Sequence, residues 1–211
     1  MASSNSTRER ILQTSLQLFN AEGLPSVSTH RIAAELGMSP GNLHYHFKTK
    51  QSIVERLFKR FEEQLLLLDG SFDAILAIDD LWLALHLRFE AISNHRFVYR
   101  DMAFLASEYP VLGARVQALT AQNLLAAQAL CQGLVSSGVI QAAEDQVQVL
   151  ALQMVFTTTC WLSFERLLPG RDAGGQADPG LAAYYTLTLV SPYVSRESRA
   201  YLDYLRAKYL G

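Results

Sequence analysis

Cysteine is scarce in this chain of 211 residues, which contains only Cys131 and Cys160. Both lie in apolar, helix-like segments and make no metal-like pair, so they predict buried thiols in a reducing compartment. Long apolar runs are also lacking, since segments such as 65–68 and 81–85 are far too short to span a bilayer. The first residues, MASSNSTRER, have no apolar core of the kind found in secretory signals. We therefore expect a soluble, cytoplasmic protein with no membrane partner.

The sequence patterns of common catalytic and metal sites are missing as well. There is no Gly-x-Ser-x-Gly, no reactive-cysteine context and no glycine-rich phosphate loop. His44 and His46 lie two residues apart, so on a helix they diverge by about 200° and cannot share a metal easily. His86 and Glu90 have helical spacing, but the second Glu-x-x-His of a di-iron bundle is absent. The sequence thus predicts no enzyme, no metal site and no cofactor.

Charged residues make up only 18% of the chain and nearly cancel, leaving a net charge of −2. Their distribution is uneven. Residues 1–50 hold five Lys and Arg against three acidic residues, whereas residues 51–211 hold 13 basic against 17 acidic residues. A mildly basic head on an acidic body suits a local contact with phosphate, but it excludes a uniformly basic nucleic-acid coat. Half of the residues are hydrophobic, which is enough for a substantial core.

Helix signals dominate the N-terminal 50 residues. Ser6-x-x-Glu9 has the form of a capping box and predicts the start of a first helix. Ser28 and Ser39 are expected to cap two short helices, the second of which has Pro40 in its first turn. Three helices within about 45 residues, joined by tight glycine-containing turns, indicate a helix-turn-helix.

The remainder of the chain also predicts helices, which makes the expected fold all-α. Thr49 is expected to cap a fourth helix, and residues 171–180 form the one clear linker. The further helices are expected at about 74–94, 97–107, 111–136, 144–168, 179–192 and 195–209.

The segment 144–168 differs from the other predicted helices, because it carries apolar residues on both sides and no charge between positions 146 and 163. A helix that is apolar nearly all round must be covered on both sides. The second cover is expected to be a ligand cavity, a partner subunit or both. The alternative is the central helix of a monomeric core.

The stretch SPGNLHYHFKTK, residues 39–50, has the pattern of a DNA-recognition helix. Leu43 and Phe47, at i and i+4, anchor the helix from below and leave a short polar face. Pro40, Gly41 and Asn42 stand at its N-terminus, where small size permits close approach and asparagine can bond adenine in a bidentate way. The residues expected to contact bases or phosphates are Thr29, His30, Pro40, Gly41, Asn42, His44, Tyr45, His46, Lys48 and Lys50.

Residues 10–54, RILQTSLQLFNAEGLPSVSTHRIAAELGMSPGNLHYHFKTKQSIV, resemble the TetR family of bacterial one-component transcriptional regulators, in order and without gaps. The family has an aromatic-rich pattern at 43–47, in which His44 here replaces the commonest tyrosine. The segment FVYRDMAFL, 97–105, is similar to a Phe-x-Tyr-Arg-Asp motif of one subgroup. Family positions that commonly touch the DNA backbone correspond to Tyr45, Lys48 and Lys50.

The resemblance implies an all-α homodimer with a helix-turn-helix domain at 1–50, a connecting helix at about 50–68, and a ligand-binding and dimerisation domain at 51–211. Dimer contacts are implied at about 144–168 and 179–192. The implied function is that of a repressor that binds a palindromic operator in double-stranded DNA. A small hydrophobic effector releases the repressor from this operator. An activator, a regulator controlled by a protein, and an all-helical adaptor or enzyme without DNA binding are the alternatives. The candidates for the ligand pocket are Trp82, His86, Phe89, Phe104, Trp161 and Phe164.

Overall fold

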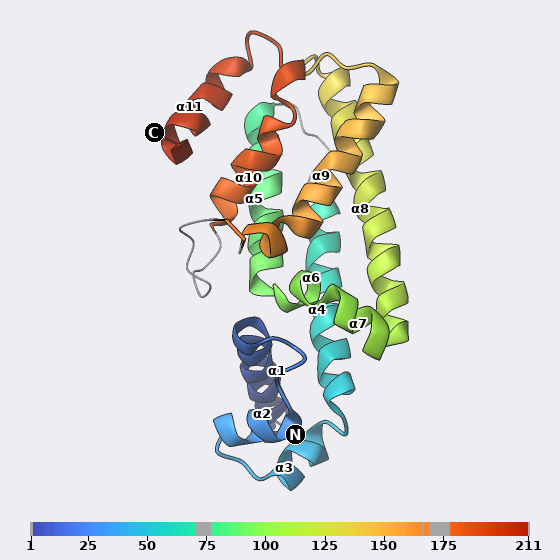
Figure 1. Cartoon of the computed structure of the whole chain (residues 1–211), viewed down its shortest axis with the longest axis vertical. Coiled ribbons are helices and arrows are strands. Elements are labelled where there is room, and N and C mark those ends of the chain that lie inside the picture. Colours follow the sequence, from blue (N-terminus) through green and yellow to red (C-terminus); the bar gives the residue numbers. More distant parts are fainter. Residues whose placement is uncertain (1, 71–76, 166, 169–177, 211) are drawn as a thin grey trace. The chain divides into compact units, whose positions relative to one another are not determined.

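The computed structural model describes residues 2–70, 77–165, 167–168 and 178–210 (Figure 1). Within these residues the regular elements are helices, and one isolated β-bridge joins Ile140 to Val194. The predicted all-α fold is therefore confirmed. The elements are α1 (Ala2–Glu22), α2 (Thr29–Glu35), α3 (Pro40–His46), α4 (Lys50–Gly70), α5 (Ile78–Asn94), α6 (Phe97–Arg100), α7 (Met102–Glu108), α8 (Pro110–Ser136), α9 (Glu144–Glu165), α10 (Pro179–Thr188), the short 3₁₀ helix η1 (Ser191–Tyr193) and α11 (Arg199–Leu210).

The chain divides into two compact units. The head unit consists of Met1–Glu63 and Asn94–Val116, and the body unit consists of Gln64–Ser93 and Gln117–Gly211. Helix α4 is continuous and contributes its first part to the head unit and its last part to the body unit. The head unit thus includes a segment far from the N-terminus, which the pattern of residues 1–50 does not indicate.

Three hydroxyl caps start helices α2, α3 and α4, as the sequence predicts. Ser28 Oγ accepts a hydrogen bond from the Arg31 N–H at 3.1 Å, and Ser39 Oγ accepts one from the Asn42 N–H at 3.2 Å. Thr49 Oγ1 accepts one in the same way at the start of α4. Such a cap satisfies one of the N–H groups left unpaired at a helix start and contributes about 1 kcal/mol.

The tight turn between α2 and α3 depends on Gly37, whose φ is +64°. Its N–H donates to Ala34 O at 3.1 Å, and the N–H of Met38 donates to Ala33 O at 3.0 Å. This pair of bonds is a Schellman motif, which requires a left-handed residue after the helix and therefore favours glycine. The turn sets the direction in which α3 leaves α2, and α2 and α3 pack against each other.

Some helix ends differ from the predicted ones. Helix α1 begins at Ala2, before the predicted capping box, because a serine inside a helix does not stop its propagation towards the N-terminus. The predicted helix 97–107 is divided at Asp101, whose φ of −106° and ψ of 24° break the helical path between α6 and α7. Residues 74–76 of the predicted fifth helix and 171–177 of the predicted linker lie outside the described residues.

Helix α9 has one buried face and one exposed face. Its buried side includes Leu150, Ala151, Met154 and Trp161. The opposite side forms the α9 stripe, whose members are 53–66% exposed in the single chain; these are Val149, Leu152, Phe156 and Phe164. The alternative of a central core helix is therefore wrong, because a core helix would be covered on both sides.

By length and composition alone, α9 is apolar enough to cross a membrane, with a mean hydropathy of 1.4 over its most apolar window. Residues of that window are 44% buried inside the fold. Partly buried helices of folded domains pass the same test, so one such helix is weak evidence for a membrane span.

Cys131 is fully buried, with Sγ 3.8 Å from Met154 Sδ, and burial raises the pKa of its thiol to about 11. Because the thiolate is the reactive form, a pKa this high leaves only about one thiol in a thousand ionised at pH 8. A Cys160→Ser variant should thus give no rapid reaction with 5,5′-dithiobis(2-nitrobenzoate) when folded, and one equivalent in guanidinium. Rapid labelling of the folded variant would contradict the buried position.

Candidate nucleic-acid interface

Helix α3 carries its polar side chains on an exposed surface and its apolar ones underneath. Leu43 is 1% exposed and Phe47 8% exposed, so these two side chains fix which face of α3 points inward. Tyr45, by contrast, is 75% exposed. The predicted contact residues on and next to this helix include the exposed Pro40, Asn42, His44, Tyr45 and Lys48 and the half-buried His46.

Gly41 lies in the first turn of α3, and a Cβ placed there would meet no atom within 4 Å. Its φ is not in the left-handed region, so neither strain nor crowding inside the chain requires glycine. Glycine in a helix is less favourable than alanine by about 1 kcal/mol. The absence of a side chain here instead leaves the backbone open to close approach from outside.

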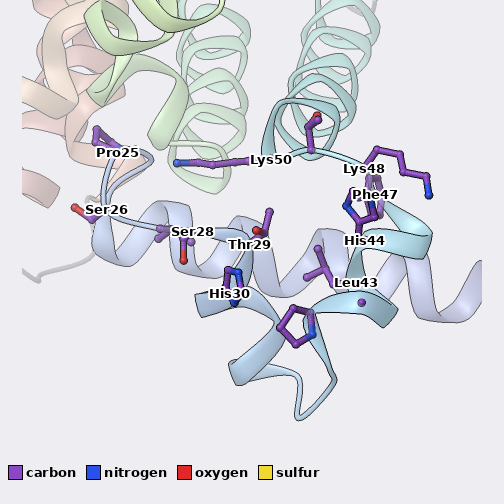
Figure 2. Close-up of a pocket in the computed structure, with 14 residues that line it drawn as sticks. Pro25, Ser26, Ser28, Thr29, His30, Leu43, His44, Phe47, Lys48 and Lys50 are labelled. Carbon is purple, nitrogen blue, oxygen red and sulfur yellow. The ribbon is translucent and has the colours of Figure 1, made fainter.

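An open groove of about 650 Å³ runs along the head unit between the start of α2 and helix α3 (Figure 2). Thr29 and His30 come from α2, whereas His44 and Lys48 come from α3 and the residues after it. The groove thus brings together seven of the ten residues that the sequence predicts as DNA contacts, because Pro40, Gly41 and Lys50 also line it. Its floor includes Leu43 and Phe47, and its other lining residues are Pro25, Ser26, Val27, Ser28, Pro40, Gly41, Thr49 and Lys50.

The structure differs from the sequence-based expectation at Lys50. Its ammonium donates to Leu24 O and lies 5.9 Å from the centre of the Phe19 ring and 5.8 Å from that of Phe104. Burial lowers the pKa of Lys50, and the negative charge of Asp101 offsets part of this effect. Lys50 therefore tethers α4 to the α1–α2 turn, because its charge is satisfied inside the head unit, while Lys48 is exposed.

Arg8 is a contributor that the sequence pattern did not single out. Its guanidinium donates to His46 O at 3.2 Å and lies 5.6 Å from the centre of the Phe47 ring. A cation near the last carbonyls of a helix stabilises that end. Arg8 thereby links α1 to the C-terminal end of α3. The only signal for this role in the sequence is the position of Arg8 on the first predicted helix, four residues before Leu12.

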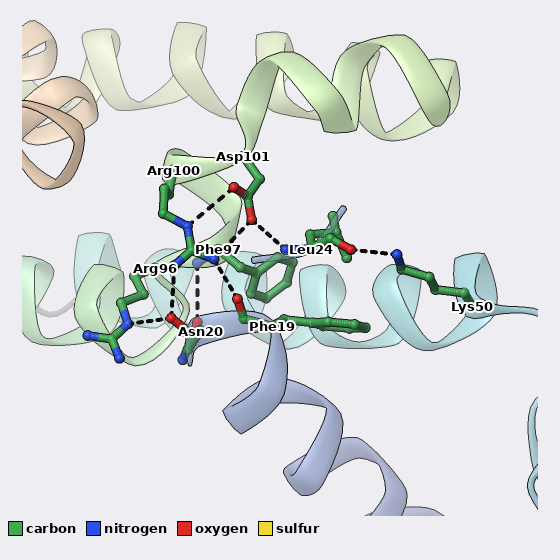
Figure 3. A network of polar contacts seen from close by, with 8 residues as sticks. All are labelled: Phe19, Asn20, Leu24, Lys50, Arg96, Phe97, Arg100 and Asp101. Atoms are coloured by element: carbon green, nitrogen blue, oxygen red, sulfur yellow. Dashed lines mark hydrogen bonds and ion pairs between the residues drawn. The ribbon is translucent and has the colours of Figure 1, made fainter. Parts of the chain in front are cut away.

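A cluster of hydrogen bonds fixes the other end of α1 to residues 94–101 (Figure 3). Arg100 donates to Phe19 O and Asn20 O, and Arg96 donates to Asn20 O at 3.1 Å. Phe19 O also accepts from the Gly23 N–H at 3.1 Å. Asn20 O is one of the last carbonyls of α1, which have no partner within the helix, so the two guanidinium groups supply its hydrogen bonds. The Asn20 side chain completes the contact, since Oδ1 accepts from the Phe97 N–H and Nδ2 donates to Asn94 O.

Asp101 extends this cluster to the turn that leads into α2. Its Oδ2 accepts from the Leu24 N–H at 2.7 Å and lies 3.1 Å from the Arg100 guanidinium. Both side chains are mostly buried, with 14% of Arg100 and 12% of Asp101 exposed. Leu24 is thus held on both sides, by Asp101 through its N–H and by Lys50 through its carbonyl. The segment 97–101 that the sequence singled out is therefore part of the support of the helix-turn-helix.

The predicted ligand-pocket residues do not all come together. Trp82 and His86 stack on α5 with ring centres 4.9 Å apart, and Trp161 of the same body unit is buried. Phe89 is a core residue with 1% exposure, and Phe164 belongs to the exposed α9 stripe. Phe104 contacts Lys50 and therefore belongs to the head unit. No group of three His, Cys, Asp or Glu suited to a metal ion occurs among the described residues.

Comparison with known families agrees with this geometry. A model of bacterial regulatory proteins of the tetR family matches residues 11–57, and a model of bacterial transcriptional repressors, TetR, matches residues 51–202. The chain belongs to the TetR family. This TetR-family protein is therefore a DNA-binding transcriptional regulator of the helix-turn-helix type, and the relatives found are transcriptional regulators.

Two solved structures and one curated protein are similar to this TetR-family protein. A TetR-family transcriptional regulator from Marinobacter aquaeolei VT8 is 31% identical, with a TM-score of 0.86 and coverage of 96% of this chain and 98% of that one. The ketosteroid transcriptional regulator KstR2 of Mycobacterium tuberculosis has the same fold, with a TM-score of 0.70, 21% identity and coverage of 91% and 97%. The HTH-type transcriptional repressor KstR2 of Mycolicibacterium smegmatis is 29% identical over 113 residues, which are 50% of this chain and 54% of that protein. The matched region thus spans about half the length of this curated relative.

Proposed function

We propose that the protein is a cytoplasmic, dimeric repressor that binds a pseudo-palindromic operator and is released by a small, hydrophobic effector. The observation that carries the DNA-binding part is the exposed polar surface of α3, held from below by Leu43 and Phe47. The open space at Gly41 supports the same proposal, because a backbone without a side chain can approach a base edge closely.

In this proposal the N-terminal residues of α3 enter the major groove, as in other helix-turn-helix proteins. Asn42 is the side chain best suited to read a base, because its amide can both donate and accept. Tyr45 on α3 and Lys48, two residues after its end, contact phosphates. Thr29 and His30, at the start of α2, contact the DNA backbone from the other side of the protein groove. His44 and His46 complete this surface. Lys50 acts indirectly, by holding the α1–α2 turn.

Dimerisation is proposed to bury the α9 stripe together with exposed parts of α10. Four large apolar side chains of the stripe are more than half exposed in the single chain, and Tyr185 of α10 is 36% exposed. An exposed apolar face of this kind is typical of a protein–protein interface. Two copies joined in this way present two α3 helices to successive half-sites of a palindromic operator.

The effector is proposed to bind in the body unit and to disfavour the DNA-binding state. Helix α4 suits the transmission of this signal, because it is continuous and belongs to both units. A ligand can shift such an equilibrium only through different affinities for the two states, and the coupling is typically about 1–3 kcal/mol.

Lys48→Ala is expected to weaken operator binding by roughly 10- to 100-fold, because each copy of the dimer loses a charge-assisted phosphate contact. The slope of log K against log salt should become less negative by about 1.8, since two phosphate contacts are lost. Tyr45→Ala should weaken binding in the same direction. Fluorescence anisotropy with labelled operator at several salt concentrations measures both quantities.

The matched control is Lys59→Ala, which removes an exposed lysine of α4 that lies 3.6 Å from Glu63 and outside the groove. This variant should keep the affinity and the salt slope of the unmodified protein. The operator is sought first in the DNA upstream of the protein's own gene by gel shift. Unchanged operator binding in both Lys48→Ala and Tyr45→Ala would contradict the proposal that this surface binds DNA.

A further inference from the structure

The body unit contains three buried side-chain nitrogens that have no hydrogen-bond partner among the described residues: Trp82 Nε1, His86 Nδ1 and Trp161 Nε1. Folded proteins pair the large majority of such groups, because a buried N–H without an acceptor has lost its water and gained nothing. Three unpaired nitrogens, all on aromatic side chains, therefore need an explanation. A bound molecule that supplies the missing partners is such an explanation.

Trp82 and His86 lie one helical turn apart on α5, with ring centres 4.9 Å apart and planes inclined by 23°. The indole nitrogen can only donate, so its missing partner must be an acceptor. The Lys208 ammonium of α11 lies 5.5 Å from the centre of the Trp82 ring and adds a positive charge to the same place. An oxygen that accepts hydrogen bonds therefore suits the indole N–H, and it also suits an imidazole that carries its proton on Nδ1.

Beyond Lys208, a series of aromatic rings leads to Trp161. Lys208 also lies 5.2 Å from the centre of the Tyr209 ring, which is 5.9 Å from that of Tyr184. Tyr184 is next to Tyr185 in the chain, and the Tyr185 ring lies 5.2 Å from that of Trp161. Helices α5, α9, α10 and α11 therefore all contribute to one cluster, in which Lys208 joins the rings of α5 to those of the other three helices. Such a cluster offers flat apolar surface on which a ring-bearing molecule can stack.

We propose that the effector of this regulator is a largely apolar, ring-bearing compound that presents an accepting oxygen, a carbonyl or a carboxylate, to Trp82 and His86. This inference rests on the proposed function, since it specifies the effector of the same body unit. The indole and imidazole nitrogens bind the oxygen, and the aromatic cluster contacts the apolar body. Lys208 favours the carboxylate over the neutral carbonyl and disfavours a cationic ligand.

The experiment uses the full-length protein, uniformly labelled with ¹⁵N, because the chain contains two tryptophans and so gives two indole N–H signals. Trp82→Phe assigns them. Three probes of similar shape are titrated: 2-naphthoate, 2-acetylnaphthalene and 2-ethylnaphthalene. The two oxygen-bearing probes should move the Trp82 indole proton downfield, as a new hydrogen bond does, and 2-ethylnaphthalene should not. Equal shifts with all three probes, or none with any of them, would overturn the inference.

Two variants test the polar end directly. His86→Phe keeps a ring but removes the nitrogen, and should weaken 2-acetylnaphthalene binding about tenfold. Lys208→Met should abolish any preference for 2-naphthoate over 2-acetylnaphthalene. Tyr204→Phe, at a residue 59% exposed, is the matched control and should change neither affinity. Unchanged binding in His86→Phe would contradict the inference, and circular dichroism verifies that each variant is folded.

Operator binding is measured on the same samples without a probe, which separates this inference from the proposed function. If the protein binds its operator but no probe moves the Trp82 signal, the effector class is wrong and the repressor proposal stands. If the oxygen-bearing probes bind as expected but no operator is bound, the site is supported and the repressor proposal fails.

Discussion

Replacing Phe156 with glutamate is expected to convert the proposed dimer to a monomer. Phe156 is the most exposed member of the α9 stripe, at 66%, and the stripe carries no charge of its own. In a symmetric interface the substitution places two unpaired carboxylates in an apolar contact, and burying each costs several kcal/mol. Because a monomer loses the second half-site, operator affinity should fall by roughly 100-fold or more.

Light scattering coupled to size-exclusion chromatography measures the first effect, since one chain has a mass of 23.5 kDa and the dimer has twice that. The matched control is Val111→Glu, which introduces the same charge at a 66% exposed apolar residue of the head unit. That variant should remain dimeric. A dimeric Phe156→Glu variant would place the interface elsewhere, and a monomeric unmodified protein would refute the proposed dimer.

Arg100→Ala is expected to lower the free energy of unfolding by about 3 kcal/mol, because removing one partner of a buried ion pair leaves the other without compensation. The change leaves Phe19 O and Asn20 O without the hydrogen bonds of Arg100 at the end of α1. Asp101 also loses its neighbouring positive charge. For a chain of about this size the melting temperature should fall by roughly 6–12 °C.

Thermal unfolding followed by circular dichroism measures this effect. The comparison variant is Arg60→Ala, which also removes an arginine–carboxylate pair, with Glu9, but at a more exposed site. Exposed ion pairs contribute about 0–1 kcal/mol to the free energy of unfolding, so the loss of stability in Arg60→Ala should be small. Asp101→Asn keeps the shape of the side chain and the bond from the Leu24 N–H. Its loss of stability should therefore lie between those of Arg100→Ala and Arg60→Ala. Equal losses in Arg100→Ala and Arg60→Ala would contradict the supporting role of the cluster in Figure 3.

Much of the fold could be predicted because its signals are local. The caps at Ser28, Ser39 and Thr49 depend on bonds to residues three positions away, so a pattern of neighbours is enough to find them. The same holds for the spacing of Leu43 and Phe47, which identifies the inward side of α3. The exposed polar surface of α3 follows from that spacing by elimination.

The parts that could not be predicted depend on contacts between residues distant in sequence. Lys50 has the pattern of a phosphate contact, yet its ammonium is bound by Leu24 O, 26 residues earlier in the chain. The bond from the Leu24 N–H to Asp101 joins positions 77 apart. No local pattern reports such a partner, so the sequence showed the similarity of Phe97–Asp101 to a subgroup motif without indicating its contact to α1.

The composition of the head unit limits how this regulator can be recombined with others. Because Asn94–Val116 belongs to the same compact unit as the helix-turn-helix, the DNA-reading part is not a cassette that ends near residue 50. A chimera that exchanges only residues 1–50 would present Arg96, Arg100 and Asp101 to the end of a foreign first helix. Exchanging operator specificity between relatives therefore requires two spliced segments, or a donor whose first helix ends in acceptors at the same positions.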